Sequence, residues 1–414
     1  MTVLIATATD CLLEKNSRNR TSKRSTLATP LAVLLAILAV LTIGFLTFLL
    51  RFNNPAHNRD CKKRVIGYYE DTGSAEIRDN HLEKLTHVVF SHQFLSAEGT
   101  IEFRNDRAKL KFEKLRNEAK RFGLKVMISI GGGQHFGSVM ATECGRSKLT
   151  DSIVSFLEKN QADGVDLFWK WPTASDKSSY SIFVKELRLK LLEMNKEYNL
   201  SVTSAPAGIP GYWPDGFDLE EMIKHVDFMN IFSMDFYGPW GWLIGPAAPL
   251  YHGIAPRENF TVDYTMNYYA CKLKETSKLN LVIPMDARIW ENVKTELPRS
   301  VVFRKADLVN GVVQATLFKS RRLATETGIN FDAAAWDEKT KSSYIFDEKF
   351  KTFSSFENKK SIEAKLSYVK EKNLGGIWIR SVNMDDDTFS MLNDVNFSDY
   401  CSAKSIGTVN YQCA

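Results

Sequence analysis

The side chains of this sequence that could do chemistry gather in one short segment, DGVDLFWKWP at residues 163–172. In a strand, alternate side chains point to the same face. The side chains that we expect on one face near the end of this strand are Asp163, Asp166, Phe168 and Lys170. Buried acids and a lysine are costly unless they pair, so the simplest interpretation is an internal Asp–Lys ion pair. Trp169 has the opposite parity and is expected in the core.

Short apolar strands alternate with amphipathic helices from Val65 onward, and this alternation must position the segment. The expected strands are Val65–Tyr69, His87–Phe94, Lys125–Ile130, Gly164–Trp169, Ser201–Ala205, Phe228–Ser233, Leu281–Met285 and Gly376–Val382. The expected helices include Ala108–Phe122, Asp151–Asn160, Tyr180–Tyr198, Thr261–Thr276 and Ile362–Lys372. Each crossover must return the chain to the same end of the sheet, so the alternation favours parallel strands.

Eight such strands predict an α/β fold, the (β/α)8 TIM barrel, although an open doubly wound sheet has the same periodicity. The longest stretch between strands, Trp290–Tyr344, predicts a short insertion between strands 7 and 8. In a barrel of this kind, functional side chains lie at the C-terminal ends of the strands.

Five segments occur in an order that matches a known family. They are KVMISIGG at 125–132, DGVDLFWKWP at 163–172, FMNIFSMDFYGPW at 228–240, PMDAR at 284–288 and GGIWIRSVNMDD at 375–386. They resemble, in turn, the third strand, the Asp-Gly-x-Asp-x-Asp-x-Glu signature, the sixth strand, the Pro-x-Tyr-Gly-Arg segment and the last strand of family 18 glycoside hydrolases, the chitinases. The sequence is most similar to nematode chitinase-like proteins. The resemblance covers residues 65–396 and implies a TIM barrel.

The resemblance also implies a catalytic site, and several of its positions hold unsuitable residues here. In the family, the substrate's N-acetyl oxygen is the nucleophile; a glutamic acid protonates the leaving oxygen, an aspartate and a tyrosine hold the acetamido group, and a tryptophan forms the floor. The corresponding residues are Lys170, Phe168, Met234 and Arg380, while Asp163 and Asp166 keep the motif. A lysine is a poor proton donor near neutral pH. We therefore expect a catalytically inactive chitinase-like protein.

The side chains that remain near the strand ends predict a binding site for chitin or another N-acetylglucosamine-containing glycan. The candidates are Tyr68, Asp235, Tyr237, Trp240, Arg288 and Trp290. Lys170 and Arg380 make the barrel mouth more cationic than in the family. An anionic glycan or a protein partner is therefore an alternative ligand. Two other functions also stay open: an interaction scaffold or signalling protein, and a glycoside hydrolase with reassigned catalytic residues.

Residues 31–50 form a separate feature, a run of apolar residues without a charge. A helix of this length spans about 30 Å, the thickness of a bilayer's hydrocarbon core, so we expect a single-pass signal anchor. It divides the chain into a cytoplasmic tail (1–30), the anchor (31–50), a linker (51–64), the barrel (65–400) and a C-terminal tail (401–414). Basic residues flank the span equally, so its orientation depends on other signals.

Those signals place the barrel on the lumenal or extracellular side of the membrane. Glycosylation acceptors at Asn199, Asn259 and Asn396 follow the span, as do five of the six cysteines. Cys401 and Cys413 close a short loop and are the expected disulfide. The histidines and cysteines lack metal-ligand spacing, so we expect neither a metal nor a cofactor. The absence of a basic helix interleaved with aromatic residues argues against nucleic-acid binding.

Overall fold

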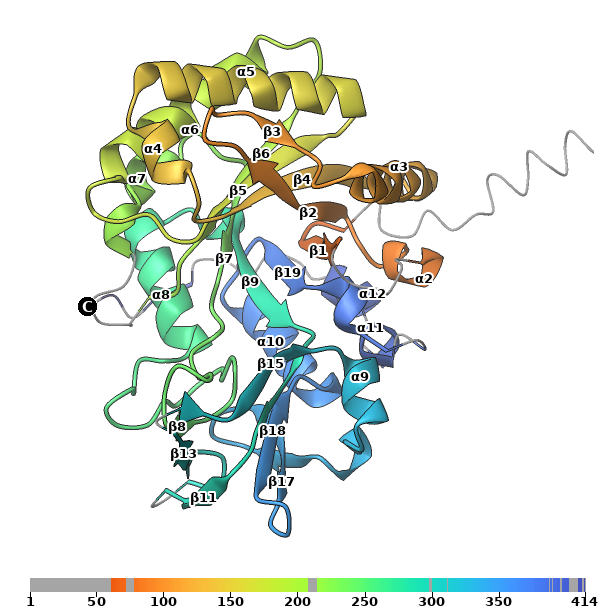
Figure 1. Cartoon of the computed structure of the whole chain (residues 1–414), viewed down its shortest axis with the longest axis vertical. Helices are drawn as coiled ribbons and strands as arrows, with labels where there is room; N and C mark the ends of the chain where they lie inside the picture. Colours follow the sequence, from red (N-terminus) through yellow and green to blue (C-terminus); the bar gives the residue numbers. More distant parts are fainter. Residues whose placement is uncertain are drawn as a thin grey trace, which may run out of the picture. The chain divides into compact units, whose positions relative to one another are not determined.

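Eight parallel strands close into a barrel in the computed structural model of the chain (Figure 1). The structure describes residues 61–71, 78–207, 214–297, 300–310, 312–386, 388, 390–394, 397–401, 409–411 and 413. Around the barrel, the strands are β1 (Arg64–Glu70), β2 (His87–Leu95), β4 (Lys125–Gly132), β5 (Gly164–Trp169), β6 (Asn199–Ser204), β7 (Phe228–Ile231), β9 (Leu279–Pro284) and β19 (Gly376–Arg380). Because β1 pairs with both β2 and β19, the sheet has no open edge there. The predicted barrel is confirmed, and the open sheet is excluded.

Helix α3 (Asp106–Arg121) shows why the predicted helices form where they do. The Asn105 side chain accepts a hydrogen bond from the backbone N–H of Ala108 at 2.9 Å, which satisfies a donor that has no partner within the helix. Phe112 is buried within the apolar stripe that the sequence shows. The chain leaves the helix at Gly123, whose positive φ is unstrained in glycine.

The other helices follow the order that the alternation requires. They are α2 (Asp79–Leu82), α4 (Phe136–Met140), α5 (Glu143–Asn160), α6 (Lys177–Leu192), α7 (Leu219–Met222), α8 (Val262–Leu273), α9 (Arg321–Glu326), α10 (Lys359–Glu371), α11 (Ser390–Asp394) and α12 (Phe397–Cys401). Short 3-10 turns occur at Pro214–Gly216, Thr276–Lys278, Phe331–Ala333 and Val382–Met384. The four further helices that the sequence predicts correspond to α5, α6, α8 and α10.

The insertion between the seventh and eighth barrel strands contains a separate antiparallel sheet, drawn in teal and blue in Figure 1. In sheet order its strands are β15 (Ala315–Lys319), β10 (Ala287–Trp290), β18 (Thr352–Phe356), β17 (Ser342–Asp347) and β16 (Ala335–Asp337). Shorter ladders join β11 (Val293–Glu296), β12 (Arg304–Ala306) and β8 (Leu243–Ile244), β13 (Leu308–Val309) and β14 (Val312–Val313), and β3 (Ile101–Glu102) with β2. The insertion is larger than the predicted Trp290–Tyr344, because β10 and β18 pair with each other across that range.

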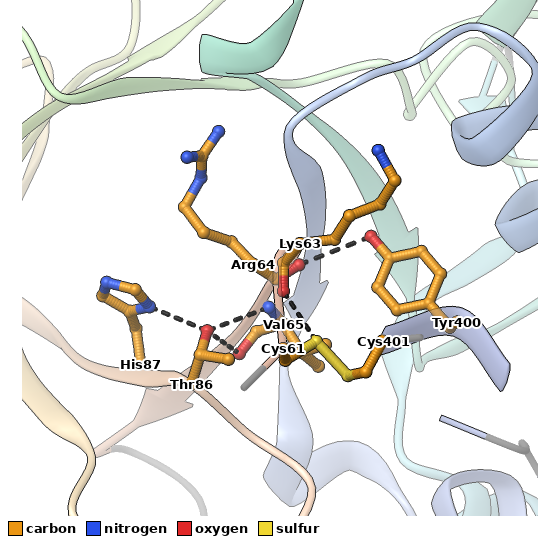
Figure 2. Close-up of a disulfide and its surroundings, with 8 residues drawn as sticks. All are labelled: Cys61, Lys63, Arg64, Val65, Thr86, His87, Tyr400 and Cys401. Carbon is orange, nitrogen blue, oxygen red and sulfur yellow. Dashed lines mark hydrogen bonds between the residues drawn. A yellow bond between two sulfur atoms is a disulfide. The ribbon is translucent and has the colours of Figure 1, made fainter. Parts of the chain in front are cut away.

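Within the described ranges, two disulfides join distant parts of the chain, and neither is the predicted Cys401–Cys413 pair. Cys61 bonds to Cys401, and Cys271 bonds to Cys413. The prediction is wrong because the fold brings the start of β1 beside α12, which places Cys61 against Cys401 (Figure 2). Among the described residues, Cys144 is the free cysteine, and it is exposed.

Hydrogen bonds join β1 both to the residue before β2 and to α12. The Thr86 hydroxyl accepts from the Val65 N–H at 3.0 Å and donates to the Val65 carbonyl at 3.1 Å. The Tyr400 hydroxyl donates to the Arg64 carbonyl at 3.5 Å (Figure 2). The Cys61–Cys401 disulfide therefore reinforces the contact that the Tyr400–Arg64 hydrogen bond makes between β1 and α12.

The predicted cytoplasmic tail (1–30), membrane anchor (31–50) and most of the linker lie outside the described residues, as does the acceptor Asn396. In the part of the chain that the structure describes, no helix is long and apolar enough to cross a membrane. Of the other acceptors, Asn199 begins β6 and Asn259 is exposed in the loop before α8.

Candidate functional site

Asp166, on β5, lies inside the barrel in a network of neutral donors. Its carboxylate accepts from the hydroxyls of Ser201 at 2.7 Å, Thr203 at 3.0 Å and Ser129 at 3.2 Å. Asn230 adds a longer contact at 3.4 Å. Burial raises the pKa of Asp166 to about 6, although these donors oppose the rise. The interior acid is therefore satisfied without a lysine.

Lys170 follows the end of β5 and pairs with Asp235. Its Nζ lies 3.9 Å from Asp235 Oδ2, and 40% of its side chain is exposed. The predicted internal ion pair of Lys170 with an aspartate of its own strand is wrong, because Asp166 is enclosed by hydroxyl groups, Asp163 pairs with Lys196, and Lys170 lies beyond the strand end. Burial lowers the pKa of Lys170; Asp235 opposes this shift, and two neighbouring arginines reinforce it.

Asp235 connects this lysine to a buried arginine. Asp235 Oδ1 accepts from Arg288 Nη2, and Arg288 Nη1 donates to the Tyr237 carbonyl at 2.7 Å. Burial by itself would raise the pKa of Asp235, but Arg288, Arg380 and Lys170 outweigh it and leave the pKa lowered. The Asp235 carboxylate is therefore shared by several cations, and the fully buried Arg288 holds it in position by a hydrogen bond.

Asp163 does not belong to the barrel mouth. It precedes β5, where Oδ1 lies 2.7 Å from Lys196 Nζ and Oδ2 accepts from the Val126 N–H at 2.9 Å. The predicted shared face with Asp166 is wrong, because side chains three positions apart in a strand point to opposite faces. Asp163 is a structural residue at the other end of the strand.

Phe168 belongs to an aromatic cluster beneath the mouth. Its ring centre lies 5.8 Å from those of both Trp171 and Phe232, and 6.4 Å from that of Trp378. Phe168 therefore occupies the position that the resemblance assigns to an orienting aspartate, and its side chain packs against other rings. Trp169 points the other way and stacks on Phe136 at 5.3 Å, as its parity predicts.

Arg380 and Trp378 share the end of β19 but occupy different environments. Trp378 is fully buried, and its indole N–H donates to the Ile231 carbonyl at 3.1 Å. Arg380 pairs with Glu70 at 3.3 Å. The position that the resemblance assigns to the floor tryptophan thus carries an ion-paired arginine, and Trp378 lies in the core.

A cavity of about 540 Å³ lies at this end of the barrel. It is lined by Lys170, Trp171, Pro206, Phe232, Met234, Asp235, Phe236, Trp240, Arg257 and Phe260. Apolar and aromatic side chains predominate, and three charged side chains are placed among them. This volume and this lining are typical of sites for small molecules.

Two of the six predicted ligand residues, Asp235 and Trp240, line the cavity, and Trp240 is 55% exposed. The other four are buried and belong to the support or the core: Tyr68, Tyr237, Arg288 and Trp290. Their burial contradicts a direct ligand contact. All six lie near predicted strand ends in the sequence, but only the folded chain decides which side chains turn toward solvent.

The cavity also contains residues that the sequence analysis missed. Trp171 and Phe232 lie within the recognised segments, so their place beside the strand ends was a usable signal. Arg257 and Phe260 lie in the loop before α8, where no pattern marks them. Asp166 is fully buried and does not line the cavity. Among the described lining residues, Asp235 is the one with a carboxylate. The described residues contain no cluster of acidic, histidine and cysteine side chains that could hold a metal.

Comparison with known proteins assigns this barrel to a family. The model of glycosyl hydrolases family 18 matches residues 64–385. The chain belongs to this family. This family 18 chain is 24% identical over 331 residues to a probable endochitinase of Caenorhabditis elegans, and 24% identical over 319 residues to chitinase-3-like protein 2 of Homo sapiens. Both alignments cover 73% of the chain; they cover 52% and 80% of the relatives, so the chain spans about half the length of the nematode protein.

Solved structures of other family 18 proteins share the fold. A family 18 N-acetylglucosaminidase from Paenibacillus barengoltzii matches with a TM-score of 0.69 and 23% identity. A family 18 chitinase from Cycas revoluta in complex with (GlcNAc)4 matches with a TM-score of 0.69 and 20% identity. Each match covers 80% of this chain and 98% of the other. These likenesses show a shared fold, and the match of the family model confirms the family that the sequence motifs indicate.

Proposed function

We propose that this family 18 chain is a catalytically inactive chitinase-like protein that binds chitin or another N-acetylglucosamine-containing glycan at the barrel mouth. The observation that carries the proposal is the Lys170–Asp235 pair, which lines a cavity together with the exposed indole of Trp240. The pair stands where the resemblance expects a proton-donating acid. The indole offers an apolar face for a sugar ring, and the related Cycas revoluta chitinase holds (GlcNAc)4.

Three replaced side chains support the absence of hydrolysis. Protonated Lys170 would repel the cationic intermediate, and the neutral amine that burial favours is a poor proton donor. Phe168 packs among other rings and has no oxygen with which to orient an acetamido group. Met234 lines the cavity without a hydroxyl group. Loss of a general acid alone costs about 10²–10⁴-fold in rate.

Two measurements on the purified full-length protein test the proposal. Incubation with N-acetylglucosamine oligomers should release no product above a heat-denatured control, and calorimetric titration should detect binding. Trp240→Ala should weaken binding about tenfold, since a stacking face worth about 1.4 kcal/mol is removed. The partly exposed Trp336, outside the cavity, provides the matched Trp336→Ala control. Product release, or equal affinities of Trp240→Ala and the wild type, would contradict the proposal.

A scaffold function is the second candidate, and one surface favours it. Helix α6 exposes Ile182, Leu189 and Leu192 by 43%, 53% and 69%. Their spacing of seven and three residues puts them on one side of the helix, where a protein partner could cover them. If no glycan binds and serine substitutions at these three positions abolish a protein complex, the scaffold function replaces the first proposal.

We also propose that residues 31–50 anchor the chain as a single-pass type II protein, with the barrel lumenal or extracellular. The two disulfides support this placement, because such bonds persist in oxidising compartments. The chain should resist carbonate extraction from membranes, and the barrel should be protected from protease in sealed microsomes. An endoglycosidase-sensitive mass that decreases in Asn259→Gln would support the same orientation. Digestion of the barrel in intact microsomes would contradict it.

A further inference from the structure

Positive charge exceeds negative charge at the cavity. Lys170 and Arg257 line it together with one carboxylate, that of Asp235. The same carboxylate also bonds to Arg288, which is fully buried. Arg288 also lies 3.7 Å from the buried Asp286 carboxylate, so two carboxylates face three positive charges. The cavity offers an excess of cationic donors to any ligand that enters.

Arg257 forms no ion pair with a carboxylate of the described residues. Its guanidinium instead lies over aromatic rings, 5.2 Å from the centre of Phe260 and 5.8 Å from that of Tyr237. It also lies against Gly241, where a Cβ atom would be 3.1 Å from Arg257 Nη2. Aromatic faces attract a guanidinium without neutralising its charge. Arg257 is thus held in place and keeps a charge that a ligand can balance.

Part of the remaining lining is suited to the face of a sugar ring. Trp171 and Trp240 contribute aromatic surface beside Lys170 and Arg257, whereas Phe232 is buried beneath Lys170, whose Nζ lies 4.8 Å from the centre of that ring. A simple anion would leave this surface unused. A neutral chitin oligomer would stack on it but would cover Arg257 without balancing its charge, which costs free energy. A ligand that satisfies both parts of the lining has sugar rings and an acidic group.

We infer that the cavity binds an acidic glycan, in which N-acetylhexosamine units alternate with uronic acid or carry sulfate. This inference rests on the proposed glycan binding and narrows its ligand. The acidic group contacts Arg257 and Lys170, and a neighbouring sugar ring stacks on Trp240. Guanidinium groups suit this task, because their planar donors match carboxylate and sulfate oxygens.

Titration of the full-length protein with hexasaccharides of equal length tests the inference. The probes are a hyaluronan hexasaccharide, which alternates N-acetylglucosamine with glucuronic acid, chitohexaose, which is neutral, and 6-O-sulfated chitohexaose. At about 0.01 M salt, where charges act over about 30 Å, at least one acidic probe should bind tenfold or more tightly than chitohexaose. At about 1 M salt this advantage should disappear. The stronger acidic probe identifies the acidic group as carboxylate or sulfate.

Arg257→Gln provides the decisive variant, since it removes the charge and keeps a polar side chain of similar reach. It should abolish the preference for acidic probes by weakening their binding tenfold or more, whereas chitohexaose, which then covers no unbalanced charge, should bind no more weakly than to the wild type. Arg121→Gln is the matched control, because Arg121 is an exposed arginine at the end of α3, outside the cavity. Equal unfolding midpoints of the variants and the wild type confirm that each protein is folded.

The outcomes separate this inference from the proposed function. If chitohexaose binds as tightly as both acidic probes, the acidic-glycan inference fails and the proposed function stands. If Arg257→Gln weakens all the probes alike, the inference also fails. If no hexasaccharide binds, both fail. If a polyglutamate peptide competes as strongly as the acidic hexasaccharides, the conclusion that the ligand is a glycan fails. The result would point to an acidic protein segment instead.

Discussion

At the residue scale, one strand end contains side chains with different environments. Asp166 is enclosed by hydroxyl groups, Phe168 by aromatic rings, and Lys170 pairs with Asp235 beyond the strand. Phe168 and Lys170 occupy positions to which the family resemblance assigns carboxyl groups. The change therefore involves the surroundings of the site as well as the acid itself.

Restoring the acid alone should not restore hydrolysis. Lys170→Glu returns a carboxyl group, but Phe168, Met234 and Arg380 still occupy the positions that hold the substrate's acetamido group and sugar ring. Because residues that act as a unit contribute non-additively, we expect no turnover of chitooligosaccharides in a reducing-end assay. An active family 18 chitinase is the positive control. Measurable turnover by the single variant would show that the remaining site is catalytically intact.

The buried acid of the barrel should make stability depend on pH. The pKa of Asp166 is about 6 in the folded chain, against 3.8 for an ordinary aspartate, so the folded state binds its proton more tightly. This contribution to the free energy of unfolding is present below about pH 4 and is lost as pH rises through about 6, by about 3 kcal/mol in total.

Asp166→Asn removes this titration. Its free energy of unfolding, relative to the wild type, should therefore rise by up to about 3 kcal/mol between about pH 4 and pH 7. Denaturant unfolding at several pH values measures the difference. Asp151→Asn, at an exposed position of α5, should follow the wild type. A relative stability of Asp166→Asn that is constant with pH would contradict the assignment.

At the element scale, the turn after β7 decides whether the cavity has a stacking face. Gly238 lies under the Trp240 ring, where a Cβ atom would be 2.3 Å from the nearest ring carbon. Such a contact is far inside van der Waals distance, so any larger residue must displace the indole. The glycine therefore matters for the placement of Trp240.

Gly238→Ala should consequently weaken glycan binding. We expect a loss of about tenfold in affinity, similar to that of Trp240→Ala, because the ring leaves its place at the cavity. Calorimetric titration measures the loss, and Trp fluorescence reports the displacement. Gly137→Ala in α4 is the control, since the added methyl group would lie 3.7 Å from its nearest neighbour, an ordinary contact. Full affinity in Gly238→Ala would mean that Trp240 does not bind the glycan.

At the scale of the whole molecule, the disulfides connect segments that the barrel brings together. Cys61–Cys401 spans 340 residues of sequence and joins the chain before β1 to α12. Cys271–Cys413 spans 142 residues and joins α8 to the C-terminal segment. Each closes a long loop, and a crosslink of this kind restricts the unfolded chain strongly.

Removing the second disulfide should destabilise the barrel without changing its fold. The double variant Cys271→Ser, Cys413→Ser should lose about 2–5 kcal/mol of unfolding free energy, measured by denaturant titration under oxidising conditions. Cys144→Ser is the control, because Cys144 is exposed and free. Non-reducing peptide mapping of the wild type should recover Cys61 with Cys401 and Cys271 with Cys413. A peptide that joins Cys401 to Cys413 would contradict these pairs.

The sequence by itself determined the alternation of strands and helices and, through its motifs, the family. Strand–helix alternation is local information, since each strand is a short apolar run and each helix shows its buried stripe at the period of its own turns. Motifs such as KVMISIGG and DGVDLFWKWP are also short, local stretches of sequence, and their order along the chain identifies the family. The replaced residues, Lys170 among them, are equally visible without coordinates.

The tertiary structure decided which side chains meet. Lys170 pairs with Asp235, sixty-five positions away, and Arg257 reaches the cavity from a loop that no pattern marks. Tyr68 and Trp290 are buried and Trp240 is exposed, although all three lie near predicted strand ends. Periodicity reports the face on which a side chain lies, whereas its partners and its exposure depend on what the rest of the chain places opposite. The physical reason is that pairing and burial are properties of surfaces formed by residues distant in sequence.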